Sequence, residues 1–219
     1  MSTDHRSRQF GVDRLLYFTD ALVAIAATLL VLPLVDDASA YAKQHDALPD
    51  ASWSTGAFLA QETYALLAFA ISFAVIARLW FAHHRLFTQV TAADAPLAAL
   101  NLLWAFTLVF LPLPTQVAAQ FGTTRGAVAF YVGTMLASSV LLTLVVVRVR
   151  RHPELREGRA RPLLTPPVAT SVLFGVALVV GVVFIRVNYL ALLLMLLSGP
   201  LEHVLEPRLD ADDDAAPPT

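Results

Sequence analysis

Runs of about 20 almost uninterrupted apolar residues recur along this chain, and each can cross a hydrocarbon core about 30 Å thick as an α-helix. Most of these runs are apolar around the whole helix, whereas a surface helix of a soluble domain keeps a polar face. Only 15% of the residues are charged, compared with roughly 25% in ordinary soluble domains. The chain is therefore predicted to be an all-α integral membrane bundle whose main partner is the lipid bilayer.

Charge and composition exclude several classes of function. A net charge of -2 gives no general affinity for nucleic acid. The chain has no Cys, which excludes disulfides, thiolate catalysis and Cys-based metal sites. No H-E-x-x-H or G-x-S-x-G sequence occurs, so we expect neither an enzyme nor a cofactor. The first apolar run is too long for a signal peptide and lacks an A-x-A exit, so it is predicted to be a retained helix.

The apolar runs predict six transmembrane helices that form one domain over residues 14–206. Residues 1–13 are predicted to be a mobile cytoplasmic tail, and the acidic residues 207–219 a disordered one. The segment 36–55 is expected to be the longest loop. The predicted helices cover residues 14–35, 56–82, 95–119 with an interruption at Pro112 and Pro114, 124–150, 167–186 and 189–205.

Lysine and arginine placement predicts the orientation of the bundle. With the N-terminus inside the cell, all but three of the 15 Lys and Arg residues fall on the cytoplasmic side, the exceptions being Lys43, Arg125 and Arg186. Basic loops stay in the cytoplasm. Both termini are therefore predicted to be cytoplasmic.

The first apolar run contains a carboxylate, Asp20, which is expensive inside a membrane unless it is paired or wetted. It is either a hydrogen-bond acceptor that holds helices together or a ligand for an ion or a proton. At 100° per residue, Asp20 points about 140° away from Ile25, which shares a stripe with Thr28, Leu29 and Leu32. An apolar stripe with one Thr is typical of lipid contact or helix packing as well as of pore lining, so the residues alone leave its role open.

Polar residues near the cytoplasmic ends of the next two helices are candidate partners for this region. Trp80, His83, His84 and Arg85 are either a membrane-surface anchor or a group whose imidazole meets Asp20 or Thr19. Adjacent His residues do not share a helix face, so they are a poor metal pair. Asn101, early in the third helix, is expected to hydrogen bond across helices.

The first helix resembles the signature of the transmembrane protein 175 family of potassium-permeable channels. Arg14 is followed after three residues by Phe18-Thr19-Asp20 and then by ALVAIAATLLVLPL, where the family usually has Arg-x-x-x-Phe-Ser-Asp. Thr19 replaces the usual Ser and keeps its hydroxyl. Trp80-x-x-His83 also resembles the end of the family's second helix.

The resemblance implies a potassium channel built from six-helix units without a re-entrant selectivity loop. Because animal members carry two units and this chain has one, it implies a homotetramer around a central pore lined by the first helix. It implies an apolar constriction at Ile25, extended by Leu29 and Leu32, and a cation-selective ring at Thr28. It also implies a helix-packing network of Arg14, Phe18, Thr19 and Asp20 with Trp80, His83 and Asn101.

Further expectations follow for ions and location. Without a TVGYG segment, selection cannot use the common carbonyl cage, and no metal is expected beyond transient potassium in the pore. Asp36 and Asp37 either concentrate cations at the outer mouth or are solvated loop charges. A single six-helix unit suggests a bacterial inner membrane.

Three other functions are compatible with parts of the sequence. A proton-coupled transporter would use Asp20 and His83 as a relay, but inverted repeats and paired broken helices are not evident. A membrane enzyme would need a nucleophile and a base, or a set of metal ligands, that meet in the fold. A structural scaffold would need no such set. Ion flux through the purified protein separates the channel from all three.

Overall fold

The computed structural model describes residues 2–47, 54–121, 124–156 and 162–184. Across these residues the fold is helical, and the β-type pairing is limited to an isolated bridge between Val90 and Arg156. The predicted all-α class is confirmed. The helices are α1 (Ser2–Leu29), α2 (Leu32–Ala47), α3 (Thr55–Gln61), α4 (Thr63–Phe87), α5 (Ala95–Phe110), α6 (Pro112–Phe121), α7 (Arg125–Arg151), the 3-10 turn η1 (Pro153–Leu155) and α8 (Thr165–Val183).

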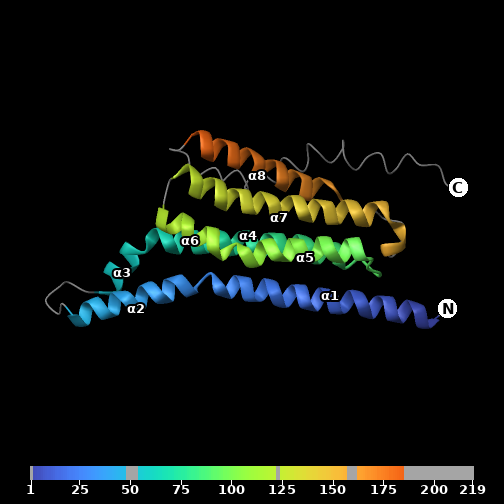
Figure 1. Cartoon of the computed structure of the whole chain (residues 1–219), viewed down its shortest axis with the longest axis horizontal. Coiled ribbons are helices and arrows are strands. Elements are labelled where there is room, and N and C mark those ends of the chain that lie inside the picture. Colours follow the sequence, from blue (N-terminus) through green and yellow to red (C-terminus); the bar gives the residue numbers. More distant parts are fainter. Residues whose placement is uncertain (1, 48–53, 122–123, 157–161, 185–219) are drawn as a thin grey trace.

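Five segments of the described chain are long and apolar enough to cross a membrane. They run side by side along the long axis of the molecule, and successive segments run in opposite directions (Figure 1). We call the end that carries the N-terminus the N-terminal end of the bundle, and the opposite end the far end. The predicted helix at 189–205 and the tail at 207–219 lie outside the described residues. The segments are Gly11–Gln44, Thr63–Phe87, Ala95–Phe121, Arg125–Arg151 and Thr165–Val183.

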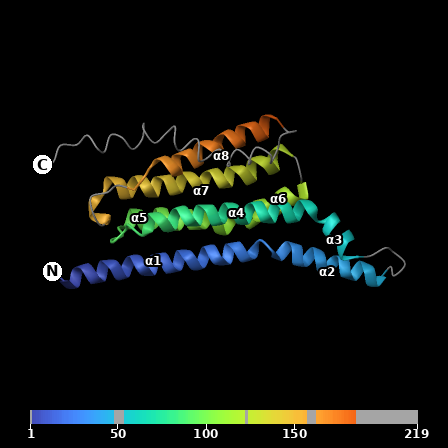
Figure 2. The same ribbon diagram turned by 180° about the vertical axis from the view of Figure 1, so that it is seen from behind.

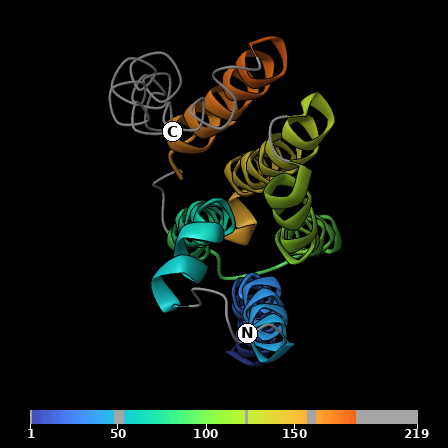
Figure 3. The ribbon, with the colours of Figure 1, turned by 90° about the vertical axis from the view of Figure 1, so that its left-hand side faces the viewer.

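α1 and α8 lie at opposite edges of the bundle. The end-on view shows α1 at one edge and α8 at the other, with α4, α5 and α7 between them (Figure 3). Seen from behind, α4 and α5 again lie between α1 and α7 (Figure 2). One side of α1 is therefore left uncovered by the described helices.

Pro33 explains the break between α1 and α2. It has no backbone N–H to donate to the carbonyl of Leu29, and its ring crowds that carbonyl. α1 ends at Leu29, and Pro33 lies in the first turn of α2, where an N–H has no intrahelical partner. The loop predicted for 36–55 is wrong in its first part, because α2 continues to Ala47 through good helix formers such as Ala, Lys and Gln.

The N-terminal segment also differs from the prediction of a mobile tail before Arg14. α1 begins at Ser2, and Val12 on it is buried. Val12 belongs to a hydrophobic cluster with Leu86, Phe87 and Val149, which come from α4 and α7. Burial of this one apolar residue among neighbours gives the helix a reason to begin before the membrane span.

The third span is interrupted where two prolines were expected to interrupt it. α5 ends at Phe110 and α6 begins at Pro112. Pro112 and Pro114 lack the N–H groups that would continue the ladder of α5. The interruption predicted at these residues is confirmed.

The interior of the bundle is an apolar cluster to which all five spans contribute. Trp104 and Leu108 of α5 are fully buried and join Val23 of α1, Val128 of α7 and Phe174 of α8 in this cluster. Lipid tails are as apolar as these side chains, so close packing and polar contacts, rather than exclusion of water, must select this arrangement.

Asp94 joins α5 to α7 at the N-terminal end. Its Oδ1 accepts a 2.8 Å hydrogen bond from the backbone N–H of Leu97, which caps α5. Its Oδ2 pairs with Arg148 of α7. The hydrogen bond from Arg148 is the main reason that the pKa of Asp94 is lowered. Beside it, the N–H groups of Thr91 and Ala92 donate to the carbonyl of Leu155, so this end of the bundle is tied together.

Candidate functional site

One face of α1 is apolar and uncovered. Ile25 is 52% exposed and Leu32 of α2 is 51% exposed, and Leu29 lies at 36% between them. The opposite face of α1 is buried: Ala26 is 0% exposed, and Val23 and Leu30 belong to the interior cluster. We call the stripe of Ile25, Thr28, Leu29 and Leu32 the α1 face. Ile25, Leu29 and Leu32 are the residues expected to form the constriction, and Thr28 the one expected to select cations. The α1 face points away from the protomer, toward either lipid or other copies of the chain.

Thr28 is the one hydroxyl on the α1 face. Its Oγ1 donates a 2.7 Å hydrogen bond to the carbonyl of Ile25, three residues earlier. A hydroxyl has one proton and two lone pairs. Because the proton is used inside the helix, the exposed Oγ1 offers its lone pairs outward, as a ligand for a cation or an acceptor for water.

Asp36 and Asp37 lie on α2 near the far end of the bundle. Asp36 is exposed and Asp37 is half-buried. They stand on a helix rather than in the loop that was predicted. Neither carboxylate makes an ion pair with another residue in the described part of the chain. Their charge is therefore available to mobile cations at this end.

Two buried hydrogen bonds cross from α4 through α5 to α1, and a third, partly buried bond continues them within α1. His83 Nε2 and Asn101 Oδ1 are 2.6 Å apart, and Asn101 Nδ2 donates to Thr19 Oγ1 at 2.6 Å. Thr19 Oγ1 then donates to the carbonyl of Leu15 at 2.8 Å. Since Asn101 Oδ1 can only accept, His83 carries its proton on Nε2 and donates it. All donors point the same way, and Thr19, His83 and Asn101 are fully buried.

Asp20 has its own partner beside this chain of bonds. Trp80 Nε1 donates a 2.8 Å hydrogen bond to Asp20 Oδ1, which joins α4 to α1. Asp20 is half-buried and does not lie on the α1 face. The structure thus joins Thr19, Asp20, Trp80, His83 and Asn101 by hydrogen bonds, and we call these five residues the polar network.

The structure does not bring Arg14 and Phe18 into the polar network. Phe18 is 53% exposed and Arg14 is exposed, on the outer side of α1. Among the described residues, neither side chain has a hydrogen bond, an ion pair or a ring contact. Their predicted place in a helix-packing network is therefore not explained by contacts among the described residues.

Two buried groups were missed by sequence reasoning. The rings of Trp104 and His83 stack in parallel, with centroids 4.1 Å apart and planes at 1°. The spacing of Trp104 three residues after Asn101, on the same helix face, was the available signal. Ser72 Oγ lies 2.9 Å from Thr115 Oγ1 and 2.7 Å from Tyr131 OH, linking α4, α6 and α7. Isolated hydroxyls in apolar runs carry no pattern that would have revealed this second cluster.

Metal chemistry finds no support in side-chain geometry. In the described ranges, no three His, Asp or Glu side chains are grouped as metal ligands. Within the network, His83 Nε2, the Asn101 amide and Trp80 Nε1 are used in hydrogen bonds between helices. The polar network can hold α1 rigidly against α4 and α5. It leaves the opposite side of α1, the α1 face, uncovered.

A family model matches the first half of the chain. The model described as endosomal/lysosomal potassium channel TMEM175 matches residues 14–112, which include α4, α5 and most of α1. All residues of the polar network lie in this range, and so does the α1 face.

Individual relatives extend the likeness beyond that range. The chain is 29% identical over 201 residues to a potassium channel of Chamaesiphon minutus, covering 84% of this chain and 95% of that one. It is 27% identical over 194 residues to the endosomal/lysosomal proton channel TMEM175 of Homo sapiens, covering 84% of this chain. The match spans only 37% of the human protein's length.

A solved structure shares the fold. The crystal structure of a lysosomal potassium-selective channel TMEM175 homolog from Chamaesiphon minutus superposes with a TM-score of 0.64. At 24% sequence identity, the comparison covers 94% of this chain and all of that one. The arrangement of helices described above is therefore that of a known membrane fold.

Proposed function

Because the chain belongs to the TMEM175 family, we propose that it is a subunit of a potassium-permeable cation channel. The observation that carries the proposal is the α1 face, an uncovered apolar stripe with one hydroxyl on the helix that the family model matches. Copies of the chain assemble with these faces turned toward a shared axis. Four copies, as expected from a single six-helix unit, form the pore.

The mechanism follows from the chemistry of the α1 face. Ile25 side chains that meet at the axis make a dry collar, which blocks water and ions until it widens. Leu29 and Leu32 extend this apolar throat toward the far end. In the open state an ion that has lost part of its hydration is coordinated by Thr28 Oγ1, directly or through water. Such a site prefers potassium over sodium only weakly, because few ligands are fixed around the ion.

The polar network serves this pore indirectly. It holds the buried side of α1 against α4 and α5 through bonds of 2.6–2.8 Å. A rigid attachment on one side fixes the rotation of α1, and therefore the direction of Ile25. Arg14 and Phe18, exposed on the protomer, are available to contact the neighbouring subunit.

The charge distribution supports an orientation with the N-terminal end in the cytoplasm. The described residues at that end include Arg14, Arg85, Arg148, Arg150 and Arg151, whereas the far end has Lys43 and Arg125. By the bias of basic residues toward the cytoplasm, Asp36 and Asp37 then lie at the outer mouth, where they concentrate cations. The membrane is the inner membrane of a bacterium.

Proton conduction is a second candidate function. Vertebrate relatives are named as proton channels, including those of Homo sapiens and Danio rerio. A relay through Asp20 and His83 would need these groups to exchange a proton. In the structure they have separate partners, Trp80 and Asn101. If protons cross, a path along the α1 face is the better supported one.

Flux through the purified chain in liposomes tests the proposal. Wild-type protein is expected to pass potassium more readily than sodium, without the saturation typical of a transporter. The Ile25→Ala variant removes the collar and should increase the basal potassium flux and reduce the preference over sodium. The matched control is Leu144→Ala, which truncates an exposed apolar side chain of α7.

Two results would count against the channel. One is unchanged flux in Ile25→Ala when the protein is correctly assembled. The other is an equal effect of Ile25→Ala and Leu144→Ala, which would show that bilayer contact rather than the α1 face sets the flux. Parallel measurement with a proton gradient decides between the two candidate ions.

A further inference from the structure

Three buried hydroxyl groups join α4, α6 and α7 inside the bundle, and the mechanism above does not use them. Ser72 Oγ lies 2.9 Å from Thr115 Oγ1 and 2.7 Å from Tyr131 OH. Thr115 Oγ1 in turn donates a 2.8 Å hydrogen bond to the carbonyl of Leu111. All three hydroxyl residues are buried. We call Ser72, Thr115 and Tyr131 the hydroxyl cluster.

The protons of the hydroxyl cluster point toward the break in the third span. A hydroxyl has one proton and two lone pairs. Because Thr115 uses its proton on the carbonyl of Leu111, Ser72 donates to Thr115, and Tyr131 donates to Ser72. Leu111 stands between α5 and α6, where Pro112 has no N–H to continue the helix. The cluster therefore attaches this break to α4 and α7, at a point where the backbone ladder is interrupted.

The hydroxyl cluster lies at the depth of the α1 face. Trp80 of α4 and Asp20 of α1 are joined by a hydrogen bond and mark a common level. The two helices run in opposite directions from there (Figure 1). Eight residues lead back along α4 from Trp80 to Ser72, and eight lead forward along α1 from Asp20 to Thr28. Each stretch rises about 12 Å, so Ser72 and Thr28 lie at about the same level.

The part of α1 that carries the α1 face has no polar attachment of its own. Thr28 is the only polar side chain in residues 21–35, and it bonds within its own helix. Leu30, in the break between α1 and α2, is buried in the same hydrophobic cluster as Leu111, in the break between α5 and α6. α1 is in contact with both α5 and α6. Packing against these two helices therefore holds the outer part of α1, and the hydroxyl cluster holds α6.

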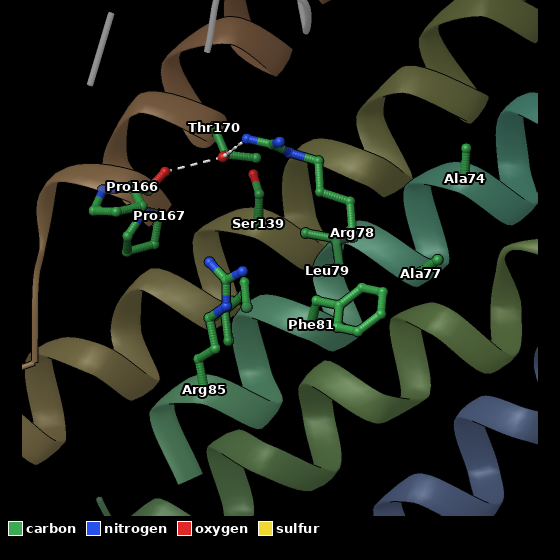
Figure 4. Close-up of a pocket in the computed structure, with 12 residues that line it drawn as sticks. Ala74, Ala77, Arg78, Leu79, Phe81, Arg85, Ser139, Pro166, Pro167 and Thr170 are labelled. Atoms are coloured by element: carbon green, nitrogen blue, oxygen red, sulfur yellow. Dashed lines mark hydrogen bonds between the residues drawn. The ribbon is translucent and has the colours of Figure 1, made fainter. Parts of the chain in front are cut away.

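α4 is a firm support for this attachment, because it is bonded to helices on several sides. Trp80 and His83 connect it to α1 and α5. Arg78 Nη2 lies 3.4 Å from Thr170 Oγ1 of α8, in a cavity of about 660 Å³ between α4, α7 and α8 (Figure 4). Ser72 extends the same support to α6.

We propose that the hydroxyl cluster is a positioning site for the pore, which fixes α6 and, through α6, the break between α1 and α2. This inference rests on the channel function proposed above. Its three members are positioning residues, because they lie behind α1 rather than on the α1 face. When the cluster loses a hydroxyl, α6 moves more freely, α1 bends at its break, and the collar at Ile25 widens for a larger fraction of the time.

Potassium flux through variants in liposomes tests this role. Thr115→Val removes the hydroxyl and keeps the shape of the side chain. One hydrogen bond between membrane helices changes an equilibrium about threefold, so the basal flux should rise about threefold. Thr115→Ser keeps the hydroxyl and should restore the wild-type flux. Tyr131→Phe, which removes the outermost hydroxyl of the cluster, should raise the flux in the same direction.

Thr134→Val is the matched control. Thr134 of α7 also donates to the carbonyl four residues earlier, that of Phe130, but it lies outside the hydroxyl cluster. Its replacement should leave the flux unchanged. Equal increases in Thr115→Val and Thr134→Val would overturn the proposal, and so would an increase in Thr115→Ser as large as that in Thr115→Val.

A second readout does not depend on ion flux. The chain has no Cys, so Leu32→Cys supplies a single thiol beyond the break of α1. Thr115→Val should speed the reaction of this thiol with a soluble thiol reagent about threefold, and Thr115→Ser should not. An unchanged rate in Thr115→Val, with Ile25→Ala still raising the flux, would overturn the positioning role and leave the channel standing. A faster rate in Thr115→Val, with no effect of Ile25→Ala on flux, would support the attachment of α1 and refute the channel.

Discussion

Asn101 joins three membrane spans, because its amide accepts a hydrogen bond from one helix and donates one to another. Its Oδ1 meets His83 of α4, and its Nδ2 meets Thr19 of α1. Stacking of Trp104 against His83 closes the space on one side of the imidazole. This amide therefore helps to determine how the three spans fit together.

Replacing Asn101 with Leu should destabilise the protein by ~1–3 kcal/mol, because the His83 Nε2–H donor would be buried without an acceptor. The measurement is the free energy of unfolding of the purified protein in detergent. Gln120→Leu is the control, since it replaces an exposed amide of α6 with the same apolar residue. Equal stability of the two variants would contradict the structural role given to Asn101.

For individual residues, the sequence predicted which polar residues take part better than it predicted the hydrogen bonds between them. The residues Thr19, Asp20, Trp80, His83 and Asn101 were singled out because polar groups in apolar runs need partners. Periodicity could not give the direction of the bonds or the tautomer of His83, because both depend on where α5 places its amide. Trp104 was missed for the same reason, since a Trp in an apolar run is usual in a core.

The helices themselves are held at the N-terminal end by an ion pair that also caps a helix. Asp94 and Arg148 are each about one-third exposed or less as side chains, so water weakens their attraction. Asn is as good a cap as Asp. Asp94→Asn therefore removes the ion pair and preserves the cap, which separates the two contributions.

We expect Asp94→Asn to cost up to ~1 kcal/mol and Asp94→Ala about 1 kcal/mol more. The folded state lowers the pKa of Asp94 below its ordinary value of 3.8. The ion pair therefore contributes fully above that value and is lost as the pH falls through the lowered pKa. Thermal unfolding of wild type and Asp94→Asn should converge in acid. A difference that persists unchanged at the lowest pH would show that charge is not the cause.

A helix boundary could be predicted when a local residue determines it, and was missed when it depends on helices far away in the sequence. The interruption at Pro112 was predictable, because a proline removes a donor wherever it stands. The continuation of α2 was not, since the acidic residues after Pro33 are typical of a loop even though good helix formers stand among them. The start of α1 was missed because the burial of Val12 depends on α4 and α7, which lie far away in sequence.

At the scale of the whole molecule, the described helices form a bundle whose two sides differ in chemistry. The α1 face is apolar, uncovered and matched by the family model. The remote side between α4, α7 and α8 carries a basic cavity. The apolar runs predicted the membrane class and six spans, five of which the structure describes. The cavity was unpredictable, because its lining residues come from α4, α7 and α8, which are far apart in the sequence.

The central claim is that the α1 face lines the pore, and the absence of Cys from the chain allows a direct test. The Thr28→Cys variant is reconstituted in liposomes and treated with a positively charged thiol reagent while potassium flux is recorded. Leu144 of α7 is exposed but lies outside the α1 face, so Leu144→Cys serves as the control. We predict that the reagent blocks flux through Thr28→Cys and leaves Leu144→Cys unaffected. Undiminished flux through a fully labelled Thr28→Cys protein would contradict the account.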